Sequence, residues 1–280
     1  MANKVFSSDW NDYELIDAGD GRKLERWGNI ITIRPEVQAY FKSESSYEEW
    51  KKIAHLEFIQ KDSKSGKWEF LKEVSIENWQ ISYKSLILNL ELTKFKHVGI
   101  FPEQATNWEF IIETLSPSSK MLNLFAYTGV ASIIGKATGA DVTHVDSVKQ
   151  LITWARKNME SSQQKNIRWI HEDALKFAQR EVKRENKYDL IIMDPPAWGI
   201  GVKNEKWKIE DKLAELISTA SKLLNPKGVL ILNTYSPKVE LEDIKLHSSS
   251  FFSRIELSEL WKKSTSGKKL FYGHLMRAWK

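Results

Sequence analysis

The chain has 280 residues, of which 41% are hydrophobic and 28% charged, so it can bury one large core or two smaller ones. Cysteine is absent, which excludes disulfides, cysteine-ligated zinc, iron–sulfur clusters and catalysis through a thiolate. The 42 basic and 37 acidic residues give a net charge of +5, an excess that tolerates a polyanionic partner without requiring one.

Other function classes are disfavoured by what the chain lacks. No segment approaches the ~20 apolar residues of a membrane helix, and residues 1–10 do not show the basic and apolar regions of a secretory signal. The six histidines include no pair at i, i+4 spacing, so no metal site is expected. We expect a cytoplasmic protein without metal. Its 12 tryptophans are suited to core packing and, less often, to stacking on nucleic-acid bases.

Residues 1–95 are predicted to form a small, β-rich N-terminal domain, read as an antiparallel module. Short alternating runs are separated by Gly, Asp-Gly or polar turns, a pattern typical of hairpins. The predicted strands lie at 13–17, 22–27, 29–33, 55–60, 67–72 and 85–93. The segment 47–52 is too short to assign.

From about residue 96 apolar strands alternate with amphipathic helices. Strands are predicted at 120–125, 142–145, 167–171, 188–193 and 229–233, and helices at 108–115, 130–138, 149–161, 174–184 and 210–224. This alternation predicts an α/β domain over 96–280, with a mostly parallel sheet and helices on both faces. A terminal hairpin at 251–260 and 270–279 surrounds a basic loop at 262–269.

Acidic residues follow three successive predicted strands. Asp146, Asp173 and Asp194 stand where open parallel sheets bind ligands, at the carboxyl ends of the strands. Each has an alternative explanation, because Asp commonly caps helices and holds turns. Together they favour a nucleoside-shaped ligand. Asp146, 17 residues after Gly129, is placed to bind ribose hydroxyls, and Asp173 to accept an adenine amine.

The turn after the first strand of this series indicates which nucleoside. In Phe125-Ala126-Tyr127-Thr128-Gly129, the glycine allows close approach of a ligand. The turn lacks the G-x-G-x-x-G pattern that binds a pyrophosphate, which disfavours NAD and FAD and hence a dinucleotide oxidoreductase. A ligand with adenine and ribose but no pyrophosphate fits better, and we expect S-adenosylmethionine.

Asp194-Pro195-Pro196 is the most specific local motif. Two prolines fix the backbone after the strand, so Asp194 and the Pro195 carbonyl can accept hydrogen bonds from a planar N–H group and hold its nitrogen toward a sulfonium methyl. Trp198 is placed either to stack on the substrate base or to pack beneath the following loop.

The motifs LNLFAYTG (122–129), VD (145–146), EDA (172–174) and DPP (194–196) together resemble those of class I S-adenosylmethionine-dependent methyltransferases. The most similar branch is that of bacterial large-subunit ribosomal RNA methyltransferases without a PUA domain. The segment VGIFPEQ (98–104) is similar to a Gly-x-Phe-x-Asp/Glu-Gln segment that lines the cofactor pocket in that family. The resemblance implies a Rossmann-like, mostly parallel seven-stranded sheet preceded by a small β module.

Strand ends and resemblance together define the candidate site. The cofactor-binding candidates are Phe101, Gln104, Asn123, Phe125, Ala126, Tyr127, Thr128, Gly129, Asp146, Ser147, Asp173, Ala174 and Asp194. The catalytic candidates are Asp194, Pro195 and Pro196, and the substrate-side candidate is Trp198.

The chain departs from the family in two places. Relatives that methylate carbon 5 of cytosine use a cysteine after the fifth strand, where this chain has Asn233-Thr234-Tyr235-Ser236. We therefore expect direct transfer to a base nitrogen, with ribosomal RNA as the partner. Position 197 is Ala, where several relatives carry Lys or Thr, so the substrate stays open. RNA would contact the β module, the loop 262–269 and residues 203–208.

Two alternatives remain: a methyltransferase acting on a small molecule or protein, and a nucleic-acid-binding protein without activity. The intact acidic set argues against the second. The sequence carries no signal for an oligomeric state.

Overall fold

The computed structural model describes residues 2–62, 65–200 and 206–280. The chain divides into two compact units. The first, here called the α/β unit, comprises Met1–Val5, Thr106–Leu260 and Tyr272–Lys280, and the second, the β unit, comprises Phe6–Ala105 and Trp261–Phe271. None of the helices in the described part is long and apolar enough to cross a membrane.

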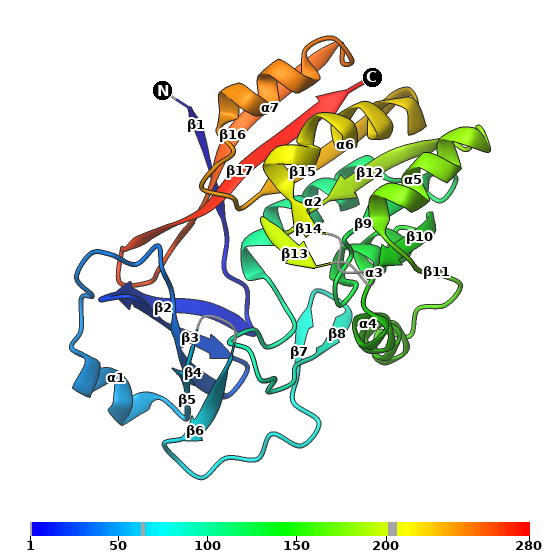
Figure 1. The fold of residues 1–280 in the computed structure, drawn as a ribbon. Helices are drawn as coiled ribbons and strands as arrows, with labels where there is room; N and C mark the ends of the chain where they lie inside the picture. Colours follow the sequence, from blue (N-terminus) through cyan, green and yellow to red (C-terminus); the bar gives the residue numbers. More distant parts are fainter. Residues whose placement is uncertain (1, 63–64, 201–205) are drawn as a thin grey trace. The chain divides into compact units, whose positions relative to one another are not determined.

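The α/β unit is built on an eight-stranded sheet with the order β1-β16-β17-β15-β12-β9-β10-β11 (Figure 1). Its strands are β1 (Asn3–Ser7), β9 (Lys120–Leu124), β10 (Asp141–Asp146), β11 (Arg168–His171), β12 (Tyr188–Met193), β15 (Leu224–Thr234), β16 (Arg254–Lys263) and β17 (Lys269–Trp279). The five strands from β15 to β11 are mutually parallel, and β17 is antiparallel to β15. The seven expected strands are present, and β1 adds an eighth at the edge.

Six helices accompany this sheet. They are α2 (Ala105–Thr114), α3 (Val130–Ala137), α4 (Lys149–Ser161), α5 (Ala174–Lys183), α6 (Ile209–Leu223) and α7 (Leu241–Ser248). The first five match the predicted helices, with small shifts at their ends. Helix α7 has no counterpart among the predictions.

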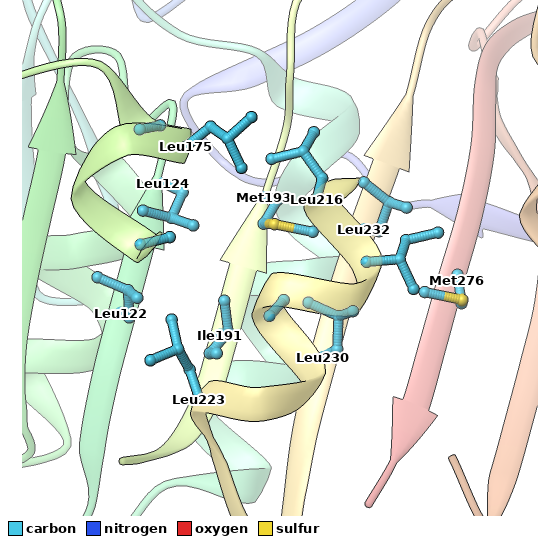
Figure 2. Close-up of a cluster of buried hydrophobic side chains, with 14 of the residues drawn as sticks. Leu122, Leu124, Leu175, Ile191, Met193, Leu216, Leu223, Leu230, Leu232 and Met276 are labelled. Carbon is cyan, nitrogen blue, oxygen red and sulfur yellow. The ribbon is translucent and has the colours of Figure 1, made fainter. Parts of the chain in front are cut away.

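The main core lies between the sheet and helices α5, α6 and α7. Figure 2 shows side chains of β9, β12, β15 and β17, including Leu124, Met193 and Leu232, directed toward Leu216 of α6. Leu124, Leu216, Met193 and Leu232 are at most 1% exposed. Burial of such a side chain contributes roughly 1.5–3 kcal/mol, so this cluster fixes the strands whose ends carry the site.

Strand order also determines where a ligand can bind. The chain runs from β9 outward to β10 and β11, then returns to place β12 on the other side of β9. Because the connections leave β9 and β12 in opposite directions, their carboxyl ends form the switch point at which open α/β sheets bind ligands. The turn after β9 and the Asp194 corner after β12 lie at this point.

The β unit contains a five-stranded sheet, a two-stranded ribbon and one α-helix. The sheet order is β2 (Tyr13–Gly19), β3 (Arg22–Trp27), β4 (Ile30–Pro35), β5 (Leu56–Gln60) and β6 (Gly66–Phe70), and the ribbon pairs β7 (Gln80–Tyr83) with β8 (Leu86–Asn89). Helix α1 (Tyr47–Ile53) precedes β5, and a 3₁₀ turn η1 (Pro102–Gln104) ends the unit.

Two details of the N-terminal prediction are wrong. The module is not wholly antiparallel, because β4 and β5 run parallel, with Thr32 opposite Leu56. This arrangement is possible because α1 lies between the two strands in the chain and carries it back to the same end of the sheet. The predicted long strand at 85–93 is also only the four residues of β8.

The tip of the β16–β17 hairpin belongs to the β unit. The amides of Thr265 and Ser266 donate to the carbonyls of Leu15 and Ile16 at 2.8 and 3.0 Å, so the tip extends along β2. The side chain of Lys262 is fully buried, and its Nζ lies 2.8 Å from an Asp9 carboxylate oxygen. The prediction that residue 262 lies in a basic loop is therefore wrong, because Lys262 belongs to β16 and its side chain is buried.

Buried ion pairs hold the end of the β unit to its sheet. Arg34 donates to both carboxylate oxygens of Glu25 at 2.7 and 2.8 Å, and its Nη1 donates to the Lys96 carbonyl. Burial raises the pKa of Glu25, but the charges of Arg34 and Lys23 outweigh burial and leave this pKa lowered. The segment that follows Lys96 and carries Phe101 and Gln104 is thus anchored to β3 and β4.

Candidate functional site

The strand ends bring most of the predicted site residues to one edge of the sheet. Asp146 is the last residue of β10, and its neighbour in the register of β11 is His171. On the other side of β9, Met193 of β12 lies opposite Leu124, so Asp194 follows directly beside the turn that begins at Phe125. The prediction that these segments share an edge is confirmed.

The turn from Phe125 to Gly129 has an unusual backbone. Phe125, Tyr127 and Gly129 have φ angles of +57°, +53° and +82°. Left-handed conformations are unfavourable for residues with a side chain, by roughly 1–2 kcal/mol each, and such strain concentrates at ligand-binding turns. Hydrogen bonds hold the turn: the Ala126 amide donates to the Val145 carbonyl at 3.1 Å, and the Tyr127 amide donates to Asp146 Oδ2 at 2.8 Å.

Gly129 is required by packing as well as by its φ angle. A Cβ at this position would lie 2.7 Å from the Cβ of Ala155 in α4, so glycine lets the start of α3 approach α4. The Asn158 side chain, also from α4, donates to the Thr128 carbonyl at 3.0 Å. Helix α4 therefore contacts the turn 125–129 through Ala155 and Asn158 and helps to fix its conformation.

Asp146 is the most constrained carboxylate of the edge. It is 8% exposed, and besides Tyr127 it accepts from the Val148 amide at 2.8 Å. Burial raises its pKa, while the two amide hydrogen bonds and His171 act in the opposite direction. A carboxylate offers about four acceptor positions, so the positions left by these two amides suit the paired hydroxyls of a ribose.

Three further cofactor-binding candidates, Asp173, Ala174 and Ser147, lie at the start of α5 and directly after β10. Asp173 is the N-cap of α5 and accepts from the Lys176 amide at 2.8 Å. The structure therefore shows Asp173 in the helix-capping role that was its alternative explanation. Ala174 is buried in the first turn of that helix. The exposed Ser147 follows Asp146 and accepts from His171 Nε2 at 3.1 Å through its carbonyl.

Asn123 points into a buried polar trio rather than along the edge. Its Nδ2 donates to Ser132 Oγ at 2.9 Å, and Ser132 Oγ lies 3.0 Å from His144 Nδ1. His144 is fully buried, and burial lowers its pKa to about 3. The trio joins β9, α3 and β10 below the turn, and Ser132 and His144 were not predicted.

The Asp-Pro-Pro corner lies at the end of β12, beside β15. Asn233 Nδ2 lies 3.5 Å from Asp194 Oδ1, while the Oδ1 of the buried Asn233 has no hydrogen-bond partner in the structure. Pro195 is buried and Pro196 exposed. The corner therefore presents carboxylate and carbonyl oxygens and no amide hydrogen from its prolines, a set of acceptors suited to an N–H group.

Two tryptophans follow the corner on a short antiparallel ribbon, β13 (Trp198–Ile200) and β14 (Lys206–Lys208). Trp198 is 50% exposed, as a residue that stacks on a substrate would be. Trp207 was not among the predicted site residues, because it lies in the segment 203–208, whose lysines indicated only a basic, RNA-contacting stretch. Its Nε1 donates to the Pro196 carbonyl at 2.7 Å. Residues 203–205 of that predicted segment lie outside the described part of the chain.

Phe101 and Gln104 belong to the β unit and are described within it. The Phe101 ring lies 5.2 Å from that of His97, and the Gln104 amide donates to the Phe101 carbonyl at 3.0 Å. Across both units, the described residues contain no group of three His, Asp or Glu side chains arranged to hold a metal ion.

The strand order, the switch point beside β9 and the acidic edge are those of class I S-adenosylmethionine-dependent methyltransferases. Residues 48–256 match the family model described as S-adenosylmethionine-dependent methyltransferase. The chain belongs to this family. The predicted fold class, enzyme class and methyl donor are confirmed.

Curated relatives carry the name ribosomal RNA large subunit methyltransferase K/L. The protein of Magnetococcus marinus is 30% identical over 167 residues, which are 58% of this chain and 23% of that protein. The protein of Hahella chejuensis is 26% identical over 258 residues, 86% of this chain and 33% of that protein. The chain thus spans a third or less of the length of these relatives.

Solved structures extend the likeness to nearly the whole chain. A SAM-dependent methyltransferase from Agrobacterium tumefaciens is 36% identical, with a TM-score of 0.90 over 99% of this chain and 93% of that one. SMU.776, solved in complex with SAH, is 18% identical with a TM-score of 0.75 over 97% of this chain and 76% of that one, which is a likeness of fold.

Proposed function

We propose that the protein transfers a methyl group from S-adenosylmethionine to a base nitrogen of ribosomal RNA, without a covalent adduct. The observation that carries this proposal is the Asp-Pro-Pro corner beside the strained turn of β9. Oxygen acceptors and a donor-binding turn stand there at adjacent strand ends.

The residues of the donor side fit S-adenosylmethionine. Asp146 would bind the ribose hydroxyls through the acceptor positions that Tyr127 and Val148 leave. Val148, 43% exposed beside it, offers an apolar surface for the adenine. Asp173, after capping α5 through one oxygen, would accept the adenine amine through the other. Bound there, the donor supplies an electrophilic methyl on a positively charged sulfur.

The substrate side would orient a nitrogen nucleophile. Asp194 and the Pro195 carbonyl accept N–H hydrogen bonds from the target base, which directs the nitrogen lone pair at the methyl carbon. As the new N–C bond forms, the C–S bond breaks and the positive charge passes from sulfur to the base, which then releases a proton. Positioning of this kind is the main contribution an enzyme makes to such a displacement.

The absence of cysteine from the sequence supports a direct route. Methylation of carbon 5 of a pyrimidine needs a nucleophile that adds to the ring, and a thiolate is the side chain suited to that step. Asn233 and Thr234, at the end of β15, supply no such nucleophile. A nitrogen lone pair needs no adduct.

An RNA substrate is supported by the names of the relatives and by the distribution of charge. Residues 156–187, which include the end of α4, β11 and α5, contain nine Lys and Arg and five Asp and Glu, a net +4 of the chain's +5. All nine basic side chains are exposed. Exposed basic side chains suit the phosphate backbone, which dominates the affinity of proteins for RNA. The proposed substrate places the reaction in the cytoplasm.

A small substrate is the second candidate, and the β unit favours it. The sequence over Phe6–Ala105 and Trp261–Phe271 carries 18 basic and 17 acidic residues. A module with balanced charge adds little to long-range attraction of RNA, so the RNA contacts of the primary proposal are assigned to the α/β unit.

The test uses Asp194→Ala, directly after β12, and a matched change at the start of that strand. Transfer of labelled methyl to ribosomal RNA from cells lacking the protein should fall at least 100-fold in Asp194→Ala, while calorimetry still detects the donor. Asp189→Ala is the control. Asp189 lies at the opposite end of β12, where its carboxylate accepts from the Lys120 amide, so its loss should leave transfer unchanged.

Unchanged transfer by Asp194→Ala would remove the corner from the mechanism. If wild-type protein binds the donor but methylates no ribosomal RNA, the second candidate replaces the first. Mass mapping of modified nucleosides identifies the target in the positive case.

A further inference from the structure

Trp207 contacts both sides of the proposed site. Its indole Nε1 donates to the Pro196 carbonyl at 2.7 Å, and its ring centroid lies 5.2 Å from that of Phe125. Pro196 belongs to the corner proposed to hold the methyl acceptor. Phe125 begins the turn proposed to hold the donor. One side chain thus joins two strand ends that are adjacent in the sheet.

The backbone around Trp207 fixes where the indole lies. Trp207 pairs with Gly199 in the β13–β14 ribbon. Two residues further on, the Ile209 amide donates to the Ala197 carbonyl at 3.2 Å, and Ile209 is fully buried at the start of α6. The rings of Trp207 and Phe125 both pack against the main core.

The chemistry of the corner explains why an outside donor matters. Pro195 and Pro196 have no amide hydrogen, so neither proline can donate a backbone hydrogen bond that would fix the conformation of the corner. The carbonyls of Pro196 and Ala197 instead accept from Trp207 and Ile209. With the Pro196 carbonyl engaged, the Pro195 carbonyl and Asp194 are the acceptors that the corner offers to a substrate.

We propose that Trp207 is a positioning residue for methyl transfer. Its N–H orients the Asp-Pro-Pro corner, and its ring supports Phe125 and thereby the donor turn. This inference rests on the proposed function of the corner and deepens it, because it names the group that aligns the two sides.

Two substitutions separate the two contacts. Trp207→Phe retains a ring against Phe125 and removes the hydrogen bond. We expect kcat on ribosomal RNA to fall about tenfold, because the free energy of one hydrogen bond corresponds to a factor of about that size in a rate constant. The Kd for S-adenosylmethionine should change less than about twofold. Trp207→Leu removes the ring as well, and the donor Kd should then rise roughly three- to tenfold.

Trp68 provides a matched control in the β unit. It also donates its indole N–H to a backbone carbonyl, that of Thr93, at 3.0 Å, and its ring lies 5.3 Å from that of Phe58. Trp68→Phe should lower Tm by an amount similar to Trp207→Phe while leaving kcat and donor Kd at wild-type values. A loss of kcat that merely follows Tm would appear in both variants.

The outcomes distinguish a failure of the Trp207 positioning role from a failure of the function proposed for the Asp-Pro-Pro corner. If Asp194→Ala is inactive while Trp207→Phe keeps wild-type kcat, the corner is catalytic and the positioning role is wrong. If Asp194→Ala remains active, the proposed function fails first. Should Trp207→Phe not fold, Trp207→His, which keeps a ring N–H, decides: recovered kcat supports the role, and a folded variant with kcat as low as Trp207→Leu overturns it.

Discussion

His144 shows how a single residue beneath the site can govern its stability. It lies in β10, which pairs with β9, and joins Asn123 and Ser132 in the buried trio under the turn. Its ring also meets Trp169 at a centroid distance of 4.8 Å. A histidine so placed is held neutral, because burial lowers its pKa to about 3.

This burial predicts a dependence of stability on pH. In an unfolded chain histidine titrates near pH 6.5, so between about pH 6.5 and 3 the unfolded state binds a proton that native His144 does not. Stability therefore falls as the pH decreases through this window, by at most about 1.4 kcal/mol per pH unit. Urea denaturation of His144→Gln between pH 7 and 4.5 should show a shallower slope than the wild type.

The half-buried His247 offers the comparison for that experiment, since it lies in α7 outside the main core. His247→Gln should retain the wild-type slope. Parallel pH profiles for wild type and His144→Gln would mean that His144 does not resist protonation in the native state.

Part of the site could be predicted residue by residue, and the reason is geometric. The placement of Asp146 and Asp194 at one edge of the sheet could be predicted, because the ends of successive parallel strands meet there. Trp207 and Asn233 contact the Asp-Pro-Pro corner through partners 11 and 39 residues away in the chain. Their contacts depend on strand pairing and rotamers that local sequence does not specify.

At the scale of elements, the region from β9 to β15 was predictable because hydrophobic residues recur there with the spacing of a helix or a strand, and short loops join the elements. The β unit was less so. Helix α1 has only Trp50 buried, which leaves little periodicity, although Ser46 and Glu49 form the capping box that marks a helix start. Parallel pairing of β4 and β5 follows from tertiary packing and leaves no local signal.

The hairpin tip gives a prediction at this scale, with neighbouring lysines as a matched pair. Lys262 is buried against Asp9 and also donates to the Ser8 carbonyl at 2.9 Å, whereas Lys263 is exposed. Lys262→Met removes the buried charge partner of Asp9, which keeps only the Leu15 amide as a donor to the same oxygen at 3.3 Å. The substitution should lower the free energy of unfolding by roughly 2 kcal/mol. Lys263→Met should change it by less than about 0.5 kcal/mol.

Thermal and urea unfolding measure both variants, and RNA binding supplies the contrasting readout. Lys262→Met, once folded, should bind RNA as the wild type does. A loss of RNA affinity in Lys262→Met without a loss of stability would restore the original view of this residue as part of a binding loop.

For the whole molecule, the concentration of positive charge between residues 156 and 187 predicts a salt-dependent affinity for RNA. Each phosphate contact that is removed should reduce the slope of log Kobs against log salt by about 0.7 to 1. The triple variant Arg156→Ala, Lys157→Ala, Lys165→Ala should therefore flatten the slope by up to about 2–3, as measured by fluorescence anisotropy with a ribosomal RNA fragment.

The half-buried Lys51 and the exposed Lys52 of α1 serve as the control, because they lie in the charge-balanced β unit. Replacing both with Ala should leave the slope unchanged. A wild-type slope near zero would favour the small-substrate candidate. Equal flattening by both sets of substitutions would show that RNA affinity depends on the total charge and not on the position of the basic residues.

The hairpin tip also bears on how the protein can be made. Residues 261–271 supply Asp9 with its buried partner and run along β2, so the β unit stays incomplete until the segment that follows the α/β part of the chain has been translated. A fragment ending near residue 105 would expose the flank of β2 as an open strand edge, which invites aggregation. Expression of this module by itself would call for the tip to be grafted back, for instance through a short linker in a permuted gene.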